Sequence, residues 1–431
     1  MIIKKSIGNK FICIFFFLML LLPASFQVPR GILLLLLLFL LIKNNTFSSF
    51  RYDKSLLIIG LINIFFSFIF TLNGIVRSTP GAIAVSTVYI IWPVLYLYFI
   101  GLSDKKANIL PFLKTIIYGG LASAILIIIF IFNNFFGFPV DISYLVKSQD
   151  FGIFWEGGAT ELNSMNLATV FYTFIFVLTL LFIPEKFYAL GISKKLIRFA
   201  LIVSLFLLFI SARRAFWLVC AISPFVILLL LKIIGIGLRL KRFIIPVLVL
   251  LSVAFTVVVY MAIDNDNLIS EFNSSFEFDN PEAESNYLRK EQFNALISGW
   301  EDNRLIGAGL GASAKGSIRD DKATWAYELS YVALLFQTGI VGIFIYGSSV
   351  FWIIYQSIIV CRKNKYYVSY LLPQITALIC FLLVNASNPY LSKFDYLWTI
   401  FLPLATLNAI KLEKKLDEMP VELKYFKRSS L

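Results

Sequence analysis

The sequence predicts an all-α polytopic integral membrane protein, with about twelve transmembrane helices and one large outside loop that contains short helices. Of its 431 residues, 59% are hydrophobic and only 15% are charged, whereas soluble domains have about 45–50% apolar and about 25% charged residues. The apolar residues come in runs of roughly 17–22, long enough to cross the ~30 Å hydrocarbon layer as helices. Runs such as GILLLLLLFLLI do not alternate apolar and polar residues, which argues against barrel strands.

The apolar runs give the predicted spans in chain order. The tenth run is longer than one span needs, which indicates an additional interfacial piece. The run at 28–42 is short for a span, and we pair it with the first one. The spans are predicted at 7–26, 28–42, 55–71, 81–101, 110–133, 162–183, 195–211, 214–234, 243–263, 326–360, 368–387 and 394–411.

The distribution of basic residues predicts the orientation. Most of the 38 Lys and Arg residues lie in the two termini and in the short loops that this span count places on one side. By the positive-inside rule that side is the cytoplasm, so both termini are predicted to be cytoplasmic. The net charge of +13 follows from this orientation. Because the basic residues do not gather on one soluble face, we expect no nucleic-acid partner.

Two residue types limit the chemistry. The sequence contains no histidine, which removes the commonest metal ligand and proton-transfer group. Its four cysteines lie in predicted spans or at the cytoplasmic end of one, so we predict no disulfide. We expect neither a metal nor another cofactor.

The spans divide the chain into three parts. Residues 1–263 hold the first nine spans, with a smaller outside loop at about 134–161. Residues 264–325 form the large outside loop, whose acidic residues outnumber its basic residues. Residues 326–431 hold the last three spans and a cytoplasmic tail.

Within the large loop, the segment PEAESNYLRKEQFNALISGW predicts a helix, with Ser285 as its cap. Arg289, Phe293, Leu296 and Trp300 have the spacing of one helical face. This pattern fits an arginine that lies at the bilayer surface or one that is directed at a lipid headgroup.

The segment GAGLGASAKGS follows that helix and contains a degenerate dinucleotide-binding pattern. We reject a dinucleotide site, because no strand precedes the pattern and the loop faces away from the cytoplasm. Glycines at 307, 309 and 311 instead allow close backbone approach and unusual dihedral angles. They are also consistent with a tight return of the loop onto the membrane domain.

Three charged residues at the outer ends of spans are the candidates for chemistry. Arg213 and Arg214 lie in the turn between the seventh and eighth spans, where a guanidinium either anchors the interface or binds an anion such as phosphate. If that turn is helical, the two side chains point about 100° apart, so one can bind phosphate while the other packs. Glu328 lies at the outer end of the tenth span, where a carboxylate either caps the helix or acts as a base.

At this point the motifs resemble the superfamily of O-antigen polymerases and O-antigen ligases. LIGAGLGA followed by YELSYVALLFQTGIVG is similar to the family's glycine loop and the helix after it. ISARRAF is similar to its Ser-Arg turn, GATELNSMNLAT to its Asn-containing entry to a span, and NPYLSKFDYLW to its Asn-Pro turn. Each motif is short, and their order carries the resemblance over most of the chain. Ligases carry histidine where this chain has Glu328, so the resemblance favours a polymerase.

The resemblance implies a bacterial inner-membrane glycosyltransferase whose active site faces the periplasm. The expected substrate is an oligosaccharide linked to undecaprenyl diphosphate, and expected partners are membrane lipid and a chain-length regulator protein. Arg214, Arg213 and Arg289 would bind the diphosphate, with Arg214 preferred, and Glu328 would be the general base. Lys147 takes the place of an arginine of the family's first outside loop. The candidate site residues are catalytic Glu328, Arg214 and Arg289, and substrate-binding Arg213, Lys147, Arg319, Gly309 and Tyr327.

Three alternatives remain open. A flippase for lipid-linked oligosaccharide would also have about twelve spans, but it would place charges within spans and have short loops. An O-antigen ligase is disfavoured by the missing histidine. The third alternative is a membrane scaffold without chemistry.

Overall fold

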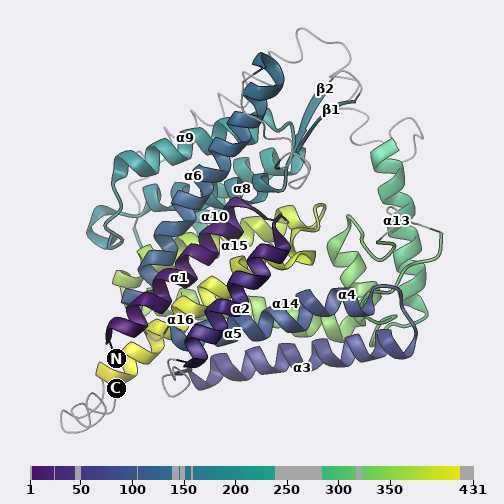
Figure 1. Cartoon of the computed structure of the whole chain (residues 1–431), viewed down its shortest axis with the longest axis horizontal. Coiled ribbons are helices and arrows are strands. Elements are labelled where there is room, and N and C mark those ends of the chain that lie inside the picture. Colours follow the sequence, from purple (N-terminus) through teal and green to yellow (C-terminus); the bar gives the residue numbers. More distant parts are fainter. Residues whose placement is uncertain are drawn as a thin grey trace.

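The chain is predominantly helical in its computed structural model, which describes residues 2–23, 25–43, 50–103, 105–137, 145, 151–156, 159–237, 284–316 and 323–417 (Figure 1). The helices before the first strand are α1 (Ile2–Leu21), α2 (Gln27–Lys43), α3 (Lys54–Val76), α4 (Ala82–Ser86), η2 (Thr87–Ile91), α5 (Trp92–Leu102) and α6 (Lys106–Phe136). The strands β1 (Gly152–Glu156) and β2 (Ala159–Asn163) follow, then α8 (Asn166–Phe182), η3 (Glu185–Phe187), α9 (Lys194–Ile210) and α10 (Arg214–Ile234). The last part contains α13 (Glu284–Glu301), α14 (Ser330–Lys363), η4 (Lys365–Tyr367), α15 (Val368–Asn385), η5 (Tyr390–Ser392), η6 (Phe394–Tyr396) and α16 (Trp398–Asp417).

Within the described residues, six helices are long and apolar enough to cross a membrane. They are 54–76, 82–102, 106–134, 214–234, 330–363 and 365–385, and shorter apolar helices lie at 10–21, 27–39 and 166–182. Every predicted span coincides with a helix except 243–263, which lies outside the described residues. The protein is therefore a helical membrane protein, and the count of twelve spans stays a prediction.

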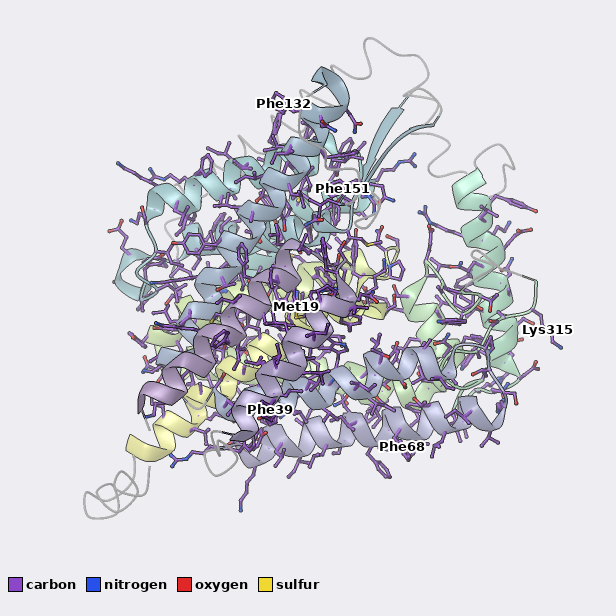
Figure 2. All side chains as sticks on the ribbon, in the orientation of Figure 1. Met19, Phe39, Phe68, Phe132, Phe151 and Lys315 are labelled. Atoms are coloured by element: carbon purple, nitrogen blue, oxygen red, sulfur yellow. The ribbon has the colours of Figure 1, made fainter. Side chains whose placement is uncertain are left out.

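Large apolar side chains cover the outside of these helices. Phe39, Phe68 and Phe132 project from the ribbon, whereas Met19 and Phe151 lie within it (Figure 2), and the first three are about half exposed while the last two are buried. A soluble protein would bury such side chains, but in a bilayer they face hydrocarbon.

Helix α8 is the centre of the helical bundle. Every side chain in it except that of Leu181 is buried, as expected of a helix that is apolar on all sides. Gly120 of α6 lets α6 and α8 approach closely, because a Cβ at that glycine would lie 2.1 Å from the Thr173 hydroxyl of α8.

A two-stranded hairpin precedes α8. Strands β1 and β2 pair antiparallel, with Gly152 opposite Asn163 and Trp155 opposite Thr160. The sequence predicts a loop up to 161 and a span from 162, whereas α8 begins four residues later, at Asn166. The missed signal is a Gly-Gly pair between two short segments rich in aromatic and β-branched residues, which is typical of hairpins.

Helix α13 lies across the ends of α3 and α14 rather than along them (Figure 1). It coincides with the predicted loop helix, although it begins at Glu284, one residue before the predicted cap Ser285. The predicted face is only partly correct: Leu296 is fully buried, but Phe293 is 46% exposed. The helix packs instead through Gln292, which is buried, and through Gly299. Only a glycine at 299 leaves room for the Phe336 ring.

The segment GAGLGASAKGS, called the glycine segment below, returns onto the membrane helices, as its composition allowed. Helix α14 is broken at Gly339, whose φ of 65° and ψ of −169° are not helical. The broken stretch pairs with the glycine segment, because Ala308 and Gly309 N–H donate to the Phe336 and Gln337 carbonyls at 2.9 and 3.0 Å. On its other side the segment contacts α3, where Leu310 N–H donates to the Phe70 carbonyl at 3.1 Å.

Gly339→Ala is expected to prevent stable folding. An added Cβ would lie 2.2 Å from the Leu305 carbonyl oxygen, and the backbone conformation alone costs a non-glycine residue about 1–3 kcal/mol. Size-exclusion chromatography of the detergent-solubilised protein would show loss of the monodisperse peak. Gly347→Ala is the matched control, because nothing lies within 4 Å of a Cβ there; equal behaviour of the two variants would contradict the account of the break.

Candidate active site

Arg289 and Glu328, predicted separately as catalytic residues, form an ion pair. The Arg289 Nε donates to Glu328 Oε2 at 2.6 Å, and the two side chains are 36% and 17% exposed. Arg289 comes from the second turn of α13, and Glu328 lies two residues before α14. The structure thus joins a cation and a carboxylate, 39 residues apart, at the outer edge of the helices.

Gln292 holds the backbone that carries Glu328. Its side-chain oxygen accepts hydrogen bonds from the N–H groups of Glu328 and Leu329, both at 3.0 Å, and the residue is 5% exposed. These contacts satisfy N–H groups just before the start of α14, where no helical acceptor exists. Sequence reasoning missed Gln292, although its position three residues after Arg289 places it on the same face of a helix.

Tyr327 and Gly309 lie in the protein interior. The Tyr327 side chain is 4% exposed, and its hydroxyl accepts a hydrogen bond from Ala314 N–H at 2.5 Å. Burial raises the pKa of the Tyr327 phenol above its ordinary value. Gly309 is buried, has a φ of 99°, and has no room for a Cβ beside Gly74. Both residues hold the glycine segment in place.

Arg213 joins three separate turns. Its Nη1 donates to Asn388 Oδ1 at 3.2 Å and to the Tyr390 hydroxyl at 3.4 Å, and its Nη2 donates to Asn163 Oδ1. Asn163 ends β2, Arg213 precedes α10, and Asn388 and Tyr390 follow α15. These residues belong to three of the motifs that carry the family resemblance, so the motifs meet at one guanidinium.

Arg214 has a different environment from its neighbour. It is the first residue of α10 and is exposed. Leu218, Ile222, Phe225 and Leu229 continue the exposed face of the same helix at helical spacing. Arg214 therefore stands at one end of an exposed apolar stripe, as expected of a basic residue at the end of a membrane-spanning helix.

The end of α15 links the two groups of residues. The Ser330 hydroxyl, at the start of α14, donates to the Asn385 carbonyl, and the Asn385 side chain accepts from Leu391 N–H at 2.8 Å. Asn388, three residues after Asn385, is the acceptor of Arg213. A short path of contacts thus connects Arg213 and its acceptors to the segment that carries Glu328.

Two predicted substrate contacts, Lys147 and Arg319, lie outside the described residues. The charged pair between Arg30 of α2 and Asp395 of η6, both of them buried, was not predicted. The signal was an arginine within an apolar run, since a charge in such a place needs a partner.

Arg213→Lys is expected to destabilise the protein by about 1–3 kcal/mol, because an ammonium cannot reach three acceptors that a planar guanidinium spans. A thermal unfolding curve of the purified protein measures this. Arg214→Lys is the matched control and should leave the unfolding temperature unchanged. If Arg213→Lys unfolds at the wild-type temperature, the guanidinium does not hold the three turns together.

No known family's sequence profile matches this chain, and no curated protein is similar to it at a significant level.

Proposed function

We propose that the protein is a polymerase of O-antigen or a related surface polysaccharide, a membrane glycosyltransferase whose donor is a glycan on undecaprenyl diphosphate. The observation that carries the proposal is the Arg289–Glu328 contact at 2.6 Å. It puts an anion-binding group and a potential base next to each other at the end of the apolar helices. Transfer of a sugar from a diphosphate to a hydroxyl needs these two groups.

In this proposal the acceptor hydroxyl of a lipid-linked repeat unit attacks the anomeric carbon of the donor glycan. The new glycosidic C–O bond forms as the bond from that carbon to the phosphate oxygen breaks, with inversion. Glu328 takes the hydroxyl proton, and undecaprenyl diphosphate leaves with the bonding electrons. Arg289 stabilises the charge that develops on the diphosphate, and Arg214 is the second candidate for that role because of its exposed place at headgroup level. The donor is already activated, so no nucleotide is required.

The ion pair also suggests the state of the site before substrate binds, in which the Arg289 guanidinium and the Glu328 carboxylate neutralise each other. A diphosphate offers the Arg289 guanidinium two charged acceptors in a geometry that suits its planar fork. Binding would therefore move Arg289 from Glu328 to the diphosphate. The carboxylate is then free to accept the proton of the acceptor hydroxyl.

The membrane arrangement is part of the same proposal. Twelve spans with both termini in the cytoplasm put α13 and the start of α14 at the periplasmic face of the bacterial inner membrane. The crosswise course of α13 supports this, because a helix outside the hydrocarbon layer need not run along the spans (Figure 1). Arg289 and Glu328 would then meet the diphosphate at headgroup depth.

Deletion of the gene in the native bacterium, followed by gel analysis of the surface polysaccharide, tests the proposal. A polymerase mutant should display a single repeat unit on the lipid A core, because export and ligation still operate. Loss of every repeat unit would indicate a flippase or a ligase instead. An unchanged ladder of long chains would exclude all three activities.

A further inference from the structure

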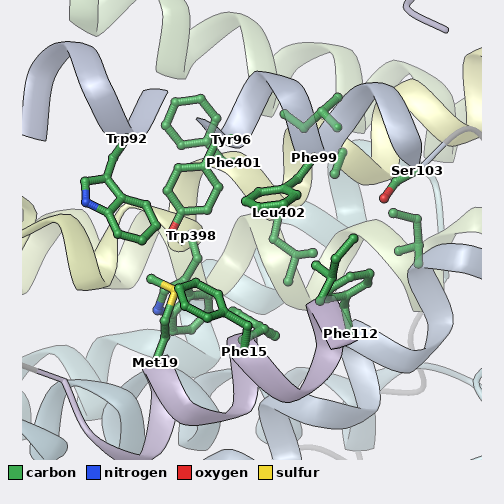
Figure 3. A pocket seen from close by; sticks show the side chains of 15 residues that line it. Phe15, Met19, Trp92, Tyr96, Phe99, Ser103, Phe112, Trp398, Phe401 and Leu402 are labelled. Atoms are coloured by element: carbon green, nitrogen blue, oxygen red, sulfur yellow. The ribbon is translucent and has the colours of Figure 1, made fainter. Parts of the chain in front are cut away.

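A pocket with aromatic walls lies between helices α1, α5, α6 and α16, on elements other than those that carry Arg289 and Glu328. All of its 15 lining residues are apolar or aromatic except Ser103. Figure 3 shows Trp92 and Met19 toward one end and Ser103 at the other. The cavity has a volume of about 70 Å³.

The pocket follows the helices lengthwise. Along α5 and the residue after it the lining extends from Trp92 to Ser103, and along α1 from Ile12 to Met19. At 1.5 Å per residue these stretches are about 16 Å and about 10 Å long. A single leaflet has a hydrocarbon thickness of about 15 Å, half of the ~30 Å core. The lining residues therefore extend over about the length of one hydrocarbon chain of one leaflet.

Two polar groups in the pocket, the Trp398 Nε1–H and the Tyr96 hydroxyl, have no partner among the residues that the structure describes. Trp398 is 1% exposed, and its Nε1–H donor is buried without a hydrogen-bond acceptor. Its ring lies beside Phe15 and Met19 (Figure 3). A buried donor without an acceptor is costly, so the pocket is suited to a ligand that brings a neutral oxygen acceptor together with its chain.

We infer that the aromatic pocket binds one acyl chain of a membrane phospholipid, with the chain's ester carbonyl accepting a hydrogen bond from Trp398 Nε1. A fatty ester has an uncharged acceptor joined directly to its chain. A polyprenyl diphosphate does not, because its chain has no acceptor and its oxygens are charged. Burying that charge would need a free cation, and the buried cation near the pocket, Arg30, is paired with Asp395.

Native mass spectrometry of the full-length protein, purified in a mild detergent from its membrane, tests this inference. The wild-type protein should retain one phospholipid. Ala405→Phe fills the pocket with a ring, and Trp398→Phe keeps a ring but removes the donor. Each should lower the retained phospholipid by about tenfold, which corresponds to about 1.4 kcal/mol of binding free energy.

The control is Ile91→Phe, which adds a similar ring on the helical segment next to α5, at a side chain that is 50% exposed; it should retain the lipid. Thermal unfolding of each variant separates loss of lipid from loss of the fold. If Ala405→Phe does not fold, the lipid content of Trp398→Phe tests the inference. Full retention by the folded variants, no lipid on the wild-type protein, or a polyprenyl phosphate in place of the phospholipid would each overturn the inference. None of these results depends on the glycosyltransferase activity.

Discussion

Glu328→Gln is expected to remove long surface glycan chains and to slow polymerisation by about 10²–10⁴-fold, the usual contribution of a general base. The amide has nearly the size of the carboxylate and leaves the backbone held by Gln292, but it cannot take a proton from the acceptor hydroxyl. Gel analysis of surface polysaccharide in a deletion strain that carries the variant measures the effect, and immunoblotting measures the amount of protein.

The control for Glu328→Gln is Glu185→Gln, which removes the carboxylate of another ion pair. Glu185 of η3 pairs with Lys194 of α9, and both side chains are exposed. Such exposed pairs contribute only about 0.2–1 kcal/mol to stability, so this variant should make normal chains. A normal chain-length distribution with Glu328→Gln would place the base elsewhere.

Arg289→Ala is expected to have the second largest effect, a loss of about 10²–10³-fold, which is typical when one group that stabilises developing charge is removed. Arg289→Lys keeps the charge but loses the planar fork, so its activity should lie between those of the alanine variant and the wild type. The same glycan gel measures all three proteins.

Lys290→Ala is the matched control for Arg289, since it removes the adjacent positive charge of α13 at an exposed position. It should leave the ladder unchanged. Full activity of Arg289→Lys would show that the site needs only a positive charge. Full activity of Arg289→Ala would remove the arginine from the mechanism.

The fold was predictable wherever apolar runs were long. The runs at 55–71, 110–133 and 214–234 were each found as a helix because hydrophobic length is an unambiguous signal. The break at Gly339 was not predicted, because it depends on backbone pairing with residues 304–309, a contact that periodicity does not encode. The same limit explains the missed hairpin β1–β2.

The site was predictable in its residue types but not in its pairings. A charge at the end of an apolar span identified Arg213, Arg214 and Glu328, and an apolar helical face in line with the charge identified Arg289. The sequence left open which of the two adjacent arginines packs internally. The structure gives Arg213 three internal acceptors and leaves Arg214 exposed. Their difference follows from the direction of each side chain at the start of α10, which depends on the turn before it.

The most direct test is reconstitution of the purified protein in liposomes with the lipid-linked repeat unit that accumulates in the deletion strain, without nucleotide. The account predicts a ladder of multimers together with released undecaprenyl diphosphate, and neither product with the Glu328→Gln protein. A repeat unit that stays monomeric with the wild-type protein, or a ladder that Glu328→Gln forms equally well, would contradict it.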